Sequence, residues 1–327
     1  MNINSKNLIL LTGAGFTKNF GGFLGYEMWS LIFNHPLIQS NTKLKEILVD
    51  EPNYELAYND IINDSGSSGE EINIIKKVVE EAYSNLDDNI KKWNFNNDNP
   101  TSLNVYGLRD FITMFIGSGS NKQGFFFTLN QDIFMERQQF GYIPLGMSKL
   151  SHTPIWDFKK EHYKIMPGSE AVNSMQDISN CGNLLYVKLH GSYGWLSSNN
   201  QTQMVIGSNK LDYIDREPLL KWYLEIFNSV INSGNKKMVI IGYGFADEHI
   251  NDIILAGVKN HNLKVIVINP NNFTDFKARI QDKISDSVAF FNALSGYFPH
   301  TLVDIFPHDQ NQHPTAIYQN IKRSIVQ

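Results

Sequence analysis

An apolar run near the start of the chain ends abruptly in two glycines. The run covers residues 8–12, and Gly13 and Gly15 follow it with one residue between them. Apolar runs of this length are typical of buried strands. Glycine lets the backbone turn sharply and approach a ligand closely, because it has no Cβ. A helix that began here would point free N–H groups at the same spot and favour an anion. Lys18 replaces the third glycine of a G-x-G-x-x-G motif, so a tight turn without a ligand is the alternative.

Four further apolar runs also end in small or polar residues. They cover residues 124–129, 184–189, 237–241 and 263–268, and they are followed by Asn130 and Asp132, by His190, by Gly242-Tyr243-Gly244 and by Asn269. Such strands, alternating with helices, indicate a parallel sheet covered on both faces. We therefore predict an α/β fold with a Rossmann-like, doubly wound sheet. Ligands of these sheets bind beyond the carboxyl ends of the strands, where these residues would converge.

Each polar residue at a strand end also has a purely structural interpretation. Asn130 could cap a helix, His190 could be a hydrogen-bonded core histidine, and Asn269 before Pro270 could mark only a turn. The coincidence of five such strand ends is more specific than any one of them.

The length of 327 residues suits one large domain with an insertion. Helical spacing prevails over residues 36–112, with chain breakers at 64–69 and 96–100. We predict a single domain over 1–327 with a helical insertion at about 36–112. Residues 137–180 have no clear pattern, residues 194–207 suggest a hairpin, and residues 271–327 are mixed and end in a helix.

The composition excludes several classes of protein. No apolar run approaches the roughly 20 residues of a membrane span, and the first residues lack a signal-peptide pattern. A net charge of −5 gives no support for nucleic-acid binding. Cys181 is the only cysteine, which rules out an internal disulfide and a four-cysteine zinc site. We expect a cytoplasmic protein that contacts neither membrane nor nucleic acid and binds no metal.

Three motifs together resemble those of the sirtuin family, in the sirtuin order. Residues 13–17 (Gly-Ala-Gly-Phe-Thr) are similar to G-A-G-x-S, residues 128–132 (Thr-Leu-Asn-Gln-Asp) to T-Q-N-I-D, and His190-Gly191 to H-G. Residues 242–251 fit the late phosphate-binding strand of the family. The resemblance spans about residues 7–270 and is greatest to the sirtuin-like domains of bacterial anti-phage systems. Deacetylase sirtuins hold a structural zinc with four cysteines, which this chain cannot do.

The resemblance implies an NAD+ site in which Asn130 and His190 are catalytic. Asn130 would orient the ribose hydroxyls and a water, and His190 would act as a base, for which an imidazole titrating near pH ~6.5 is suited. Asp132 would hold the nicotinamide carboxamide, and Asn269 would contact the adenosine ribose. The other implied NAD+ contacts are Gly13, Ala14, Gly15, Phe16, Thr17, Gly242, Tyr243, Gly244 and Asp247. For Asp247 and His249, a helix N-cap and a surface histidine are the alternatives.

The function implied is an NAD+ glycohydrolase that depletes NAD+ during phage infection, releasing nicotinamide and ADP-ribose. A zinc-free protein deacylase or ADP-ribosyltransferase is one alternative, and a non-enzymatic sensor of NAD+ or ADP-ribose is another. An enzyme that is always active would harm its own cell. We therefore expect a companion sensor protein, with homo-oligomerisation as part of the control.

Overall fold

The structure of the chain is a computed structural model. It describes residues 5–92, 103–118, 123–137, 140–148, 160–178, 181–198, 205–207, 210–308 and 313–326. The predicted breaker at 96–100 lies outside the described residues.

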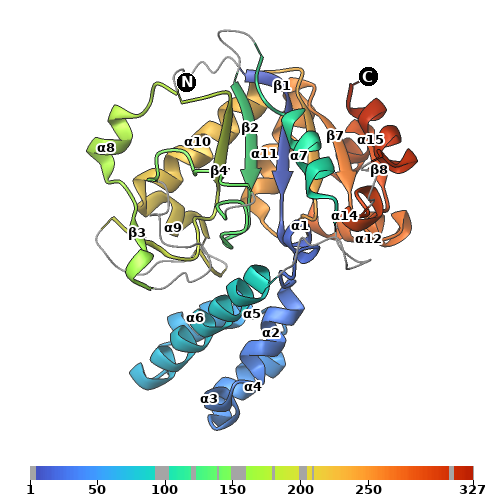
Figure 1. Ribbon diagram of the computed structural model, residues 1–327. Coiled ribbons are helices and arrows are strands. Elements are labelled where there is room, and N and C mark those ends of the chain that lie inside the picture. The colour runs from blue at the N-terminus through green and yellow to red at the C-terminus, as the bar shows by residue number, and fades with distance from the viewer. Residues whose placement is uncertain are drawn as a thin grey trace.

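Six strands form one parallel sheet in the part of the chain that the structure describes (Figure 1). The order across the sheet is β4-β2-β1-β6-β7-β8. The chain thus winds outward in one direction from β1 and in the other from β6, which is the doubly wound arrangement, and the predicted fold class is confirmed. The strands are β1 Ser5–Thr12, β2 Gln123–Thr128, β4 Leu184–Lys188, β6 Lys237–Ile241, β7 Lys264–Ile268 and β8 Leu294–Phe298.

Alternate residues of each inner strand enter different cores, as the period of two requires. Leu10 and Phe126 join one cluster, whereas Ile9 and Phe125 join the other. Both faces are therefore covered, which explains why these strands are continuously apolar. The first face packs against α7 Val105–Thr113, α14 Leu302–Ile305 and α15 Ala316–Val326. The second face packs against α8 Ser169–Ser174, α9 Lys210–Arg216, α10 Pro218–Asn232, α11 Glu248–His261, α12 Phe273–Lys283 and α13 Ser287–Ala293.

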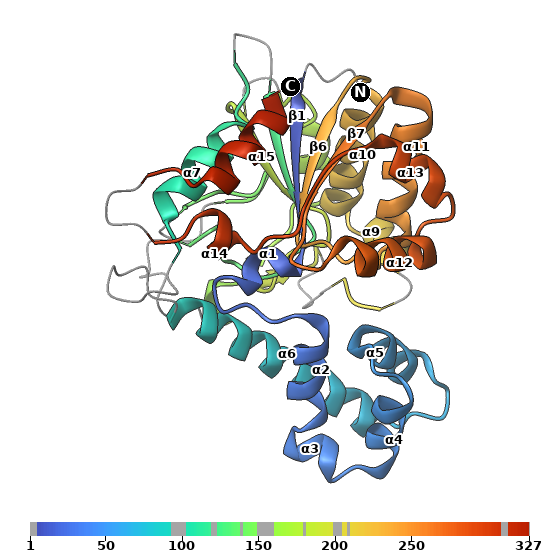
Figure 2. The same ribbon diagram turned by 90° about the vertical axis from the view of Figure 1, so that its right-hand side faces the viewer.

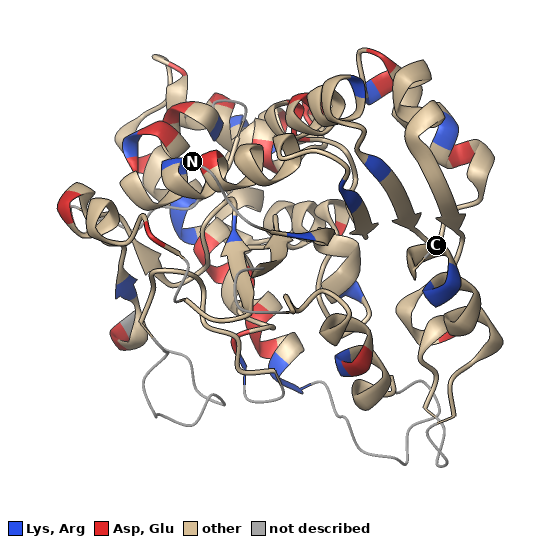
Figure 3. Cartoon of the chain, turned by 90° about the horizontal axis from the view of Figure 1, so that it is seen from above, with Lys and Arg blue, Asp and Glu red and all other residues tan. Residues whose placement is uncertain are grey.

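Charged side chains lie mostly on the helices around the sheet. Figure 3, viewed from above, shows the strands free of charge for most of their length, with Lys bands near several strand starts. Lys237 and Lys264 are the first residues of β6 and β7, at the end of the sheet away from the polar residues that follow the strands.

A group of helices lies below the carboxyl ends of the strands in Figures 1 and 2. We call these helices, from residue 25 to residue 92, the helical module. They are α2 Gly25–Phe33, α3 Pro36–Gln39, α4 Thr42–Asp50, α5 Tyr54–Asn63 and α6 Gly69–Lys92, and they follow the short α1 Ala14–Lys18. By contrast, α7 lies beside the sheet rather than in the module. The assignment of one domain with an insertion at 36–112 stays a prediction.

The hairpin predicted at residues 194–207 is wrong for its described part. β5 Trp195–Leu196 pairs in parallel with β3 Lys164–Ile165, which follows the 3-10 helix η1 Lys160–His162. Trp195 and Val205 are both buried in the second core. These two residues are thus apolar because they pack in the second core, not because they belong to two paired arms of a hairpin.

Candidate active site

A pocket of about 620 Å³ lies where the carboxyl ends of the strands face the helical module. Its size is within the range of pockets that bind small molecules and cofactors. All of the predicted site residues except Phe16 line it, namely Gly13, Ala14, Gly15, Thr17, Asn130, Asp132, His190, Gly242, Tyr243, Gly244, Asp247 and Asn269. Residues far apart in the sequence therefore meet because parallel strands bring their carboxyl ends to one edge.

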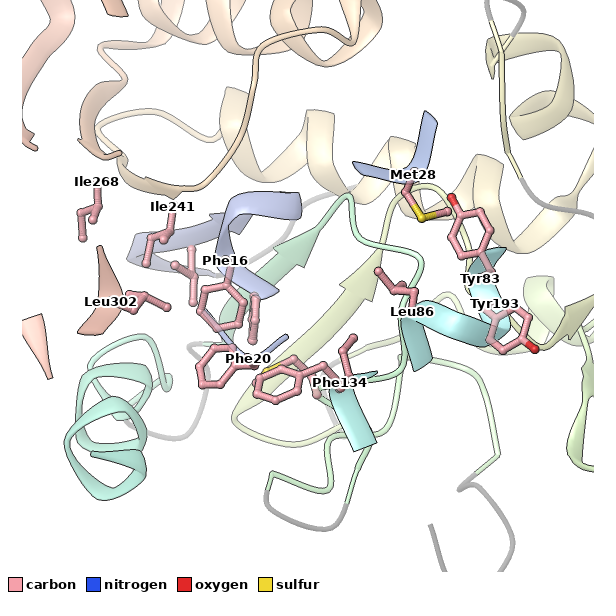
Figure 4. Packing of buried hydrophobic residues seen from close by; sticks show 14 of the residues in the cluster. Phe16, Phe20, Met28, Tyr83, Leu86, Phe134, Tyr193, Ile241, Ile268 and Leu302 are labelled. Carbon is pink, nitrogen blue, oxygen red and sulfur yellow. The ribbon is translucent and has the colours of Figure 1, made fainter. Parts of the chain in front are cut away.

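Phe16 has a different place from the one implied by the sequence. Its side chain is 1% exposed and packs against Phe20 and Phe134, as Figure 4 shows. Its backbone N–H donates to the carbonyl of Gly13 at 2.8 Å. The side chain thus anchors α1 in the core, while Ala14 and Gly15, the first two residues of α1, line the pocket.

The glycines after β1 and β6 allow two loops to touch. The N–H of Gly15 donates to the carbonyl of Gly242 at 2.9 Å. A Cβ on Gly15 would lie 2.7 Å from the Cα of Gly242, and one on Gly242 would lie 2.2 Å from the N of Phe16. Gly242 also has a φ of +66°, which L-residues with side chains rarely adopt. This close contact alone requires the glycines, whether or not a ligand approaches them.

Asn130 is held by hydrogen bonds to two threonines, Thr17 in α1 and Thr128 at the end of β2. Its side-chain Nδ2 donates to Oγ1 of Thr17 at 3.2 Å, and its backbone N–H donates to Oγ1 of Thr128 at 3.1 Å. Thr12 in turn donates to Oγ1 of Thr128 at 2.9 Å. Asn130 lines the pocket and does not cap a described helix. The hydrogen bond to Thr17 uses Nδ2 and leaves the carboxamide oxygen able to accept a further hydrogen bond.

Asp132 lies above a buried group of charges. Lys188, with 0% exposure, donates from Nζ to the backbone carbonyl of Asp132 and to Oε1 of Glu136, 2.7 Å away. The N–H of Phe134 donates to Oδ1 of Asp132 at 3.0 Å. Burial raises the pKa of Asp132, while Lys188 opposes that rise. The sequence did not indicate Lys188 or Glu136, because both stand within or just beyond otherwise apolar stretches.

His190 faces a second histidine. Its Nε2 lies 3.1 Å from Nε2 of His249, which is in the first turn of α11. Burial lowers the pKa of His190 to about 3 and also lowers the pKa of His249. Both rings are therefore neutral at pH 7. This differs from the titration near pH 6.5 that the sequence suggested for His190, because the ring is 3% exposed.

Asp247 is joined to the helical module through one lysine. Nζ of Lys210 lies 2.6 Å from Oδ1 of Asp247 and 2.6 Å from Oε2 of Glu55 in α5. Burial opposes the charge of Asp247, but the interactions with His190 and Lys210, followed by that with His249, outweigh it and hold the pKa at about 2. Because both histidines are neutral at pH 7, the positive charge beside the carboxylate at that pH is that of Lys210. Asp247 stands at the N-cap of α11 without a side-chain capping bond. Asp247 therefore occupies the N-cap position that was the structural alternative, while its side chain forms an ion pair at the pocket and does not cap the helix.

The helical module contributes part of the lining that sequence reasoning missed. The hydroxyls of Tyr54 and Tyr83 are hydrogen-bonded at 3.1 Å, and both residues line the pocket. Met28 and Leu86 also line it and lie beside Tyr83 (Figure 4). These residues occupy apolar positions of amphipathic helices, and that pattern does not distinguish a core side chain from one that faces a ligand.

Within the residues that the structure describes, no group of three or more His, Cys, Asp or Glu side chains is placed to hold a metal ion. No helix in those residues is both long enough and apolar enough to cross a bilayer.

Residues 124–285 match the family model of the SIR2-like domain. The match begins in β2, ends just after α12 and includes Asn130, Asp132 and His190. It supports a SIR2-type protein, and SIR2-like domains are NAD-utilising enzymes. A search of curated proteins finds no match to the chain.

Proposed function

We propose that the protein is an NAD+ glycohydrolase, which cleaves NAD+ to nicotinamide and ADP-ribose. The observation that carries the proposal is the convergence of Asn130, Asp132 and His190 in one pocket within the SIR2-like match. Hydrolysis breaks the bond between the nicotinamide nitrogen and C1′ of the ribose. Both electrons of that bond go to the nicotinamide, which leaves as a neutral molecule, so no general acid is needed.

The remaining task is to stabilise a cation-like ribose and to place a water. In this proposal the acidic side chains of Asp132, Asp247 and Glu55, which outnumber the one lysine beside them, Lys210, favour positive charge in the pocket. In this proposal the carboxamide oxygen of Asn130 accepts a hydrogen bond from a ribose hydroxyl or from the attacking water. In this proposal His190 takes the proton that the water or hydroxyl gives up, since its ring is neutral at pH 7 and has a free acceptor capacity.

The other end of the pocket suits the diphosphate and the adenosine. Arg279 lines the pocket from α12 and is solvent-exposed, and Asn269 and Asn271 line the same pocket. A guanidinium at this place can pair with a phosphate in a bidentate manner. Gly13 and Gly15 line the same pocket, and neither has a side chain that would keep a phosphate from the backbone. We therefore assign the diphosphate to the space between these glycines and Arg279.

Hydrolysis is favoured over protein deacylation by the lone Cys181. Four cysteines hold the zinc that supports the acyl-lysine groove of deacetylase sirtuins, and this chain cannot supply them. A deacylase would release nicotinamide only when an acylated peptide is present, whereas the hydrolase needs none. A non-enzymatic sensor would bind NAD+ and release nothing.

The test is incubation of the purified full chain with NAD+, followed by chromatography of nicotinamide and ADP-ribose. Asn130→Ala and His190→Ala should each reduce cleavage more than about 100-fold. Each should keep the melting temperature within about 4 °C of the wild type. Asn228→Ala, on the exposed side of α10, serves as the control and should retain activity. Near-normal turnover by either site variant would refute the catalytic assignment, and release that depends on an acyl peptide would favour the deacylase.

We further propose that the activity depletes NAD+ as an anti-phage effector under the control of a companion sensor protein. Uncontrolled cleavage of NAD+ would harm the host cell, so a trigger is required. Assembly into a homo-oligomer is part of this proposal. The chain would be expressed at native level with and without its neighbouring genes, and cellular NAD+ followed before and after infection. NAD+ loss and toxicity from the chain alone, without infection, would contradict external control.

A further inference from the structure

The contact between His190 and His249 has a strict requirement for protons. Two ring nitrogens at 3.1 Å form a hydrogen bond only if one carries a proton and the other does not. The ring centroids lie 5.2 Å apart with an angle of 42° between the planes. With both rings neutral, one histidine must be the Nε2–H tautomer and the other must carry its proton on Nδ1.

The charges around the pair decide which ring donates. His190 faces Asp247, Lys210 and His249, while His249 faces Asp247, Lys210 and, in its own helix, Asp252. The pair Lys210–Asp247 contributes charges of opposite sign to both rings. Asp252 is the addition that favours protonation of His249 alone.

Burial acts in the same direction. His190 is 3% exposed, whereas His249 is only half-buried. Desolvation therefore disfavours a positive charge on His190 more than on His249. The more basic imidazole of a neutral pair is the better acceptor, which makes His249 the acceptor and His190 the donor.

We propose that His249 is a positioning residue that accepts the Nε2–H of His190, leaves Nδ1 of His190 as its basic nitrogen and shares the proton that catalysis delivers. The inference rests on the proposed hydrolysis and names a residue that the family resemblance did not assign. Three observations support it: the Nε2–Nε2 distance, the unequal burial of the two rings and the carboxylate of Asp252 on the side of His249.

The proton movements balance along this pair. Water adds to C1′ of the ribose as the bond to nicotinamide breaks, and its proton passes to Nδ1 of His190. The hydrogen bond from Nε2–H of His190 to Nε2 of His249 then shares the positive charge between the two rings. Once the product has left, Nδ1 of His190 gives its proton to solvent, which restores the starting tautomers. The sum is NAD+ and water giving nicotinamide, ADP-ribose and one proton. His190 is by itself a weak base, because burial disfavours its protonated form. It becomes an effective base because His249 shares the positive charge that the buried ring of His190 would otherwise carry alone.

The test has a readout that does not depend on activity. Nitrogen NMR of ¹⁵N-histidine-labelled full chain distinguishes the two tautomers, with His190→Gln and His249→Gln used to assign the signals. We expect His190 to be the Nε2–H tautomer between pH 6 and 8, and His249 to be the Nδ1–H tautomer. In His249→Ala the His190 signal should become a mixture of tautomers. An Nδ1–H tautomer of His190 in the wild type, or an unchanged signal in His249→Ala, overturns the proposal even if NAD+ is cleaved.

Kinetics then separate proton sharing from orientation. Gln at position 249 can hold a hydrogen bond to His190 but cannot take up a proton. Both His249→Ala and His249→Gln should lower kcat by about 10-fold or more, with KM within about 3-fold, and should alter the pH profile of kcat. His261→Gln, at the other end of α11, is the control and should behave as wild type. A kcat of His249→Gln equal to that of the wild type would contradict proton sharing. If the wild type does not cleave NAD+, the proposed function is refuted, and the tautomers seen by NMR still decide whether His190 donates to His249.

Discussion

Removal of the lysine between the pocket and the helical module should destabilise the protein strongly. The side chains of Lys210 and Asp247 are 13% and 11% exposed, and Glu55 is 27% exposed. Lys210→Met keeps the length of the side chain but leaves two carboxylates without their partner. Loss of one member of a buried pair costs about 3–5 kcal/mol. The partial exposure of Glu55 places our expectation at the lower end, about 3 kcal/mol at pH 7.

The matched control is Lys221→Met. Lys221 lies 3.8 Å from Asp215, and their side chains are 55% and 64% exposed, so its loss should change stability by less than about 1 kcal/mol. The assay is urea unfolding followed by fluorescence of the five tryptophans. Asp247→Asn added to Lys210→Met should recover part of the loss, because it removes an unpaired carboxylate. If Lys210→Met is no less stable than Lys221→Met, the ion pairs do not join the module to the pocket as we argue.

Three further outcomes follow from the geometry of the pocket. Gly242→Ala should cost about 3 kcal/mol or more in urea unfolding, since its Cβ would lie 2.2 Å from the N of Phe16 at a positive φ, whereas Gly69→Ala, with open space around it at the first residue of α6, should be nearly neutral. His190 has a pKa lowered to about 3, so its contribution to stability is present above pH ~6.5 and is lost as the pH falls towards 3; the wild type should lose up to about 1.4 kcal/mol more per pH unit than His190→Gln over pH 6 to 4, and equal slopes would contradict a buried neutral ring. Arg279→Ala should raise KM for NAD+ about 10-fold with little change in kcat, and an unchanged KM would remove it from the diphosphate site.

The fold was predictable where strands are buried on both faces. β1, β2, β4, β6 and β7 have continuous apolar runs, and all five were located within a few residues. β8 was missed, because Ser295 and Gly296 interrupt its apolar residues and its side chains are only partly buried. An edge strand with one neighbour does not need the continuous apolar sequence of an inner strand.

The strand-end part of the site was also predictable, for a topological reason. Parallel strands must bring their carboxyl ends together, so Asn130 and His190 were expected to meet before any distance was known. Glu55 and Lys210 carry no such constraint. Each stands in a helix where a charge is normally on the solvent side, and only the folding of the helical module against the sheet turns both towards Asp247. Local periodicity does not report contacts between distant helices.

The charges of the pocket follow an order that matches the two ends of NAD+. Among the lining residues, the exposed cation is Arg279, while the carboxylate of Asp132 is 7% exposed. The anionic diphosphate would therefore meet positive charge near the surface, and the cationic nicotinamide ring would enter the buried, acidic part. When the bond to ribose breaks, the positive charge moves from the ring nitrogen to the sugar, and it stays within reach of the same carboxylates. Under the proposed function, an acidic interior would stabilise the charge both before and during cleavage, and it would attract the neutral nicotinamide that leaves less strongly than the cationic ring. Lys210 limits the excess of negative charge, which is why we expect its loss to affect folding as well as the pocket.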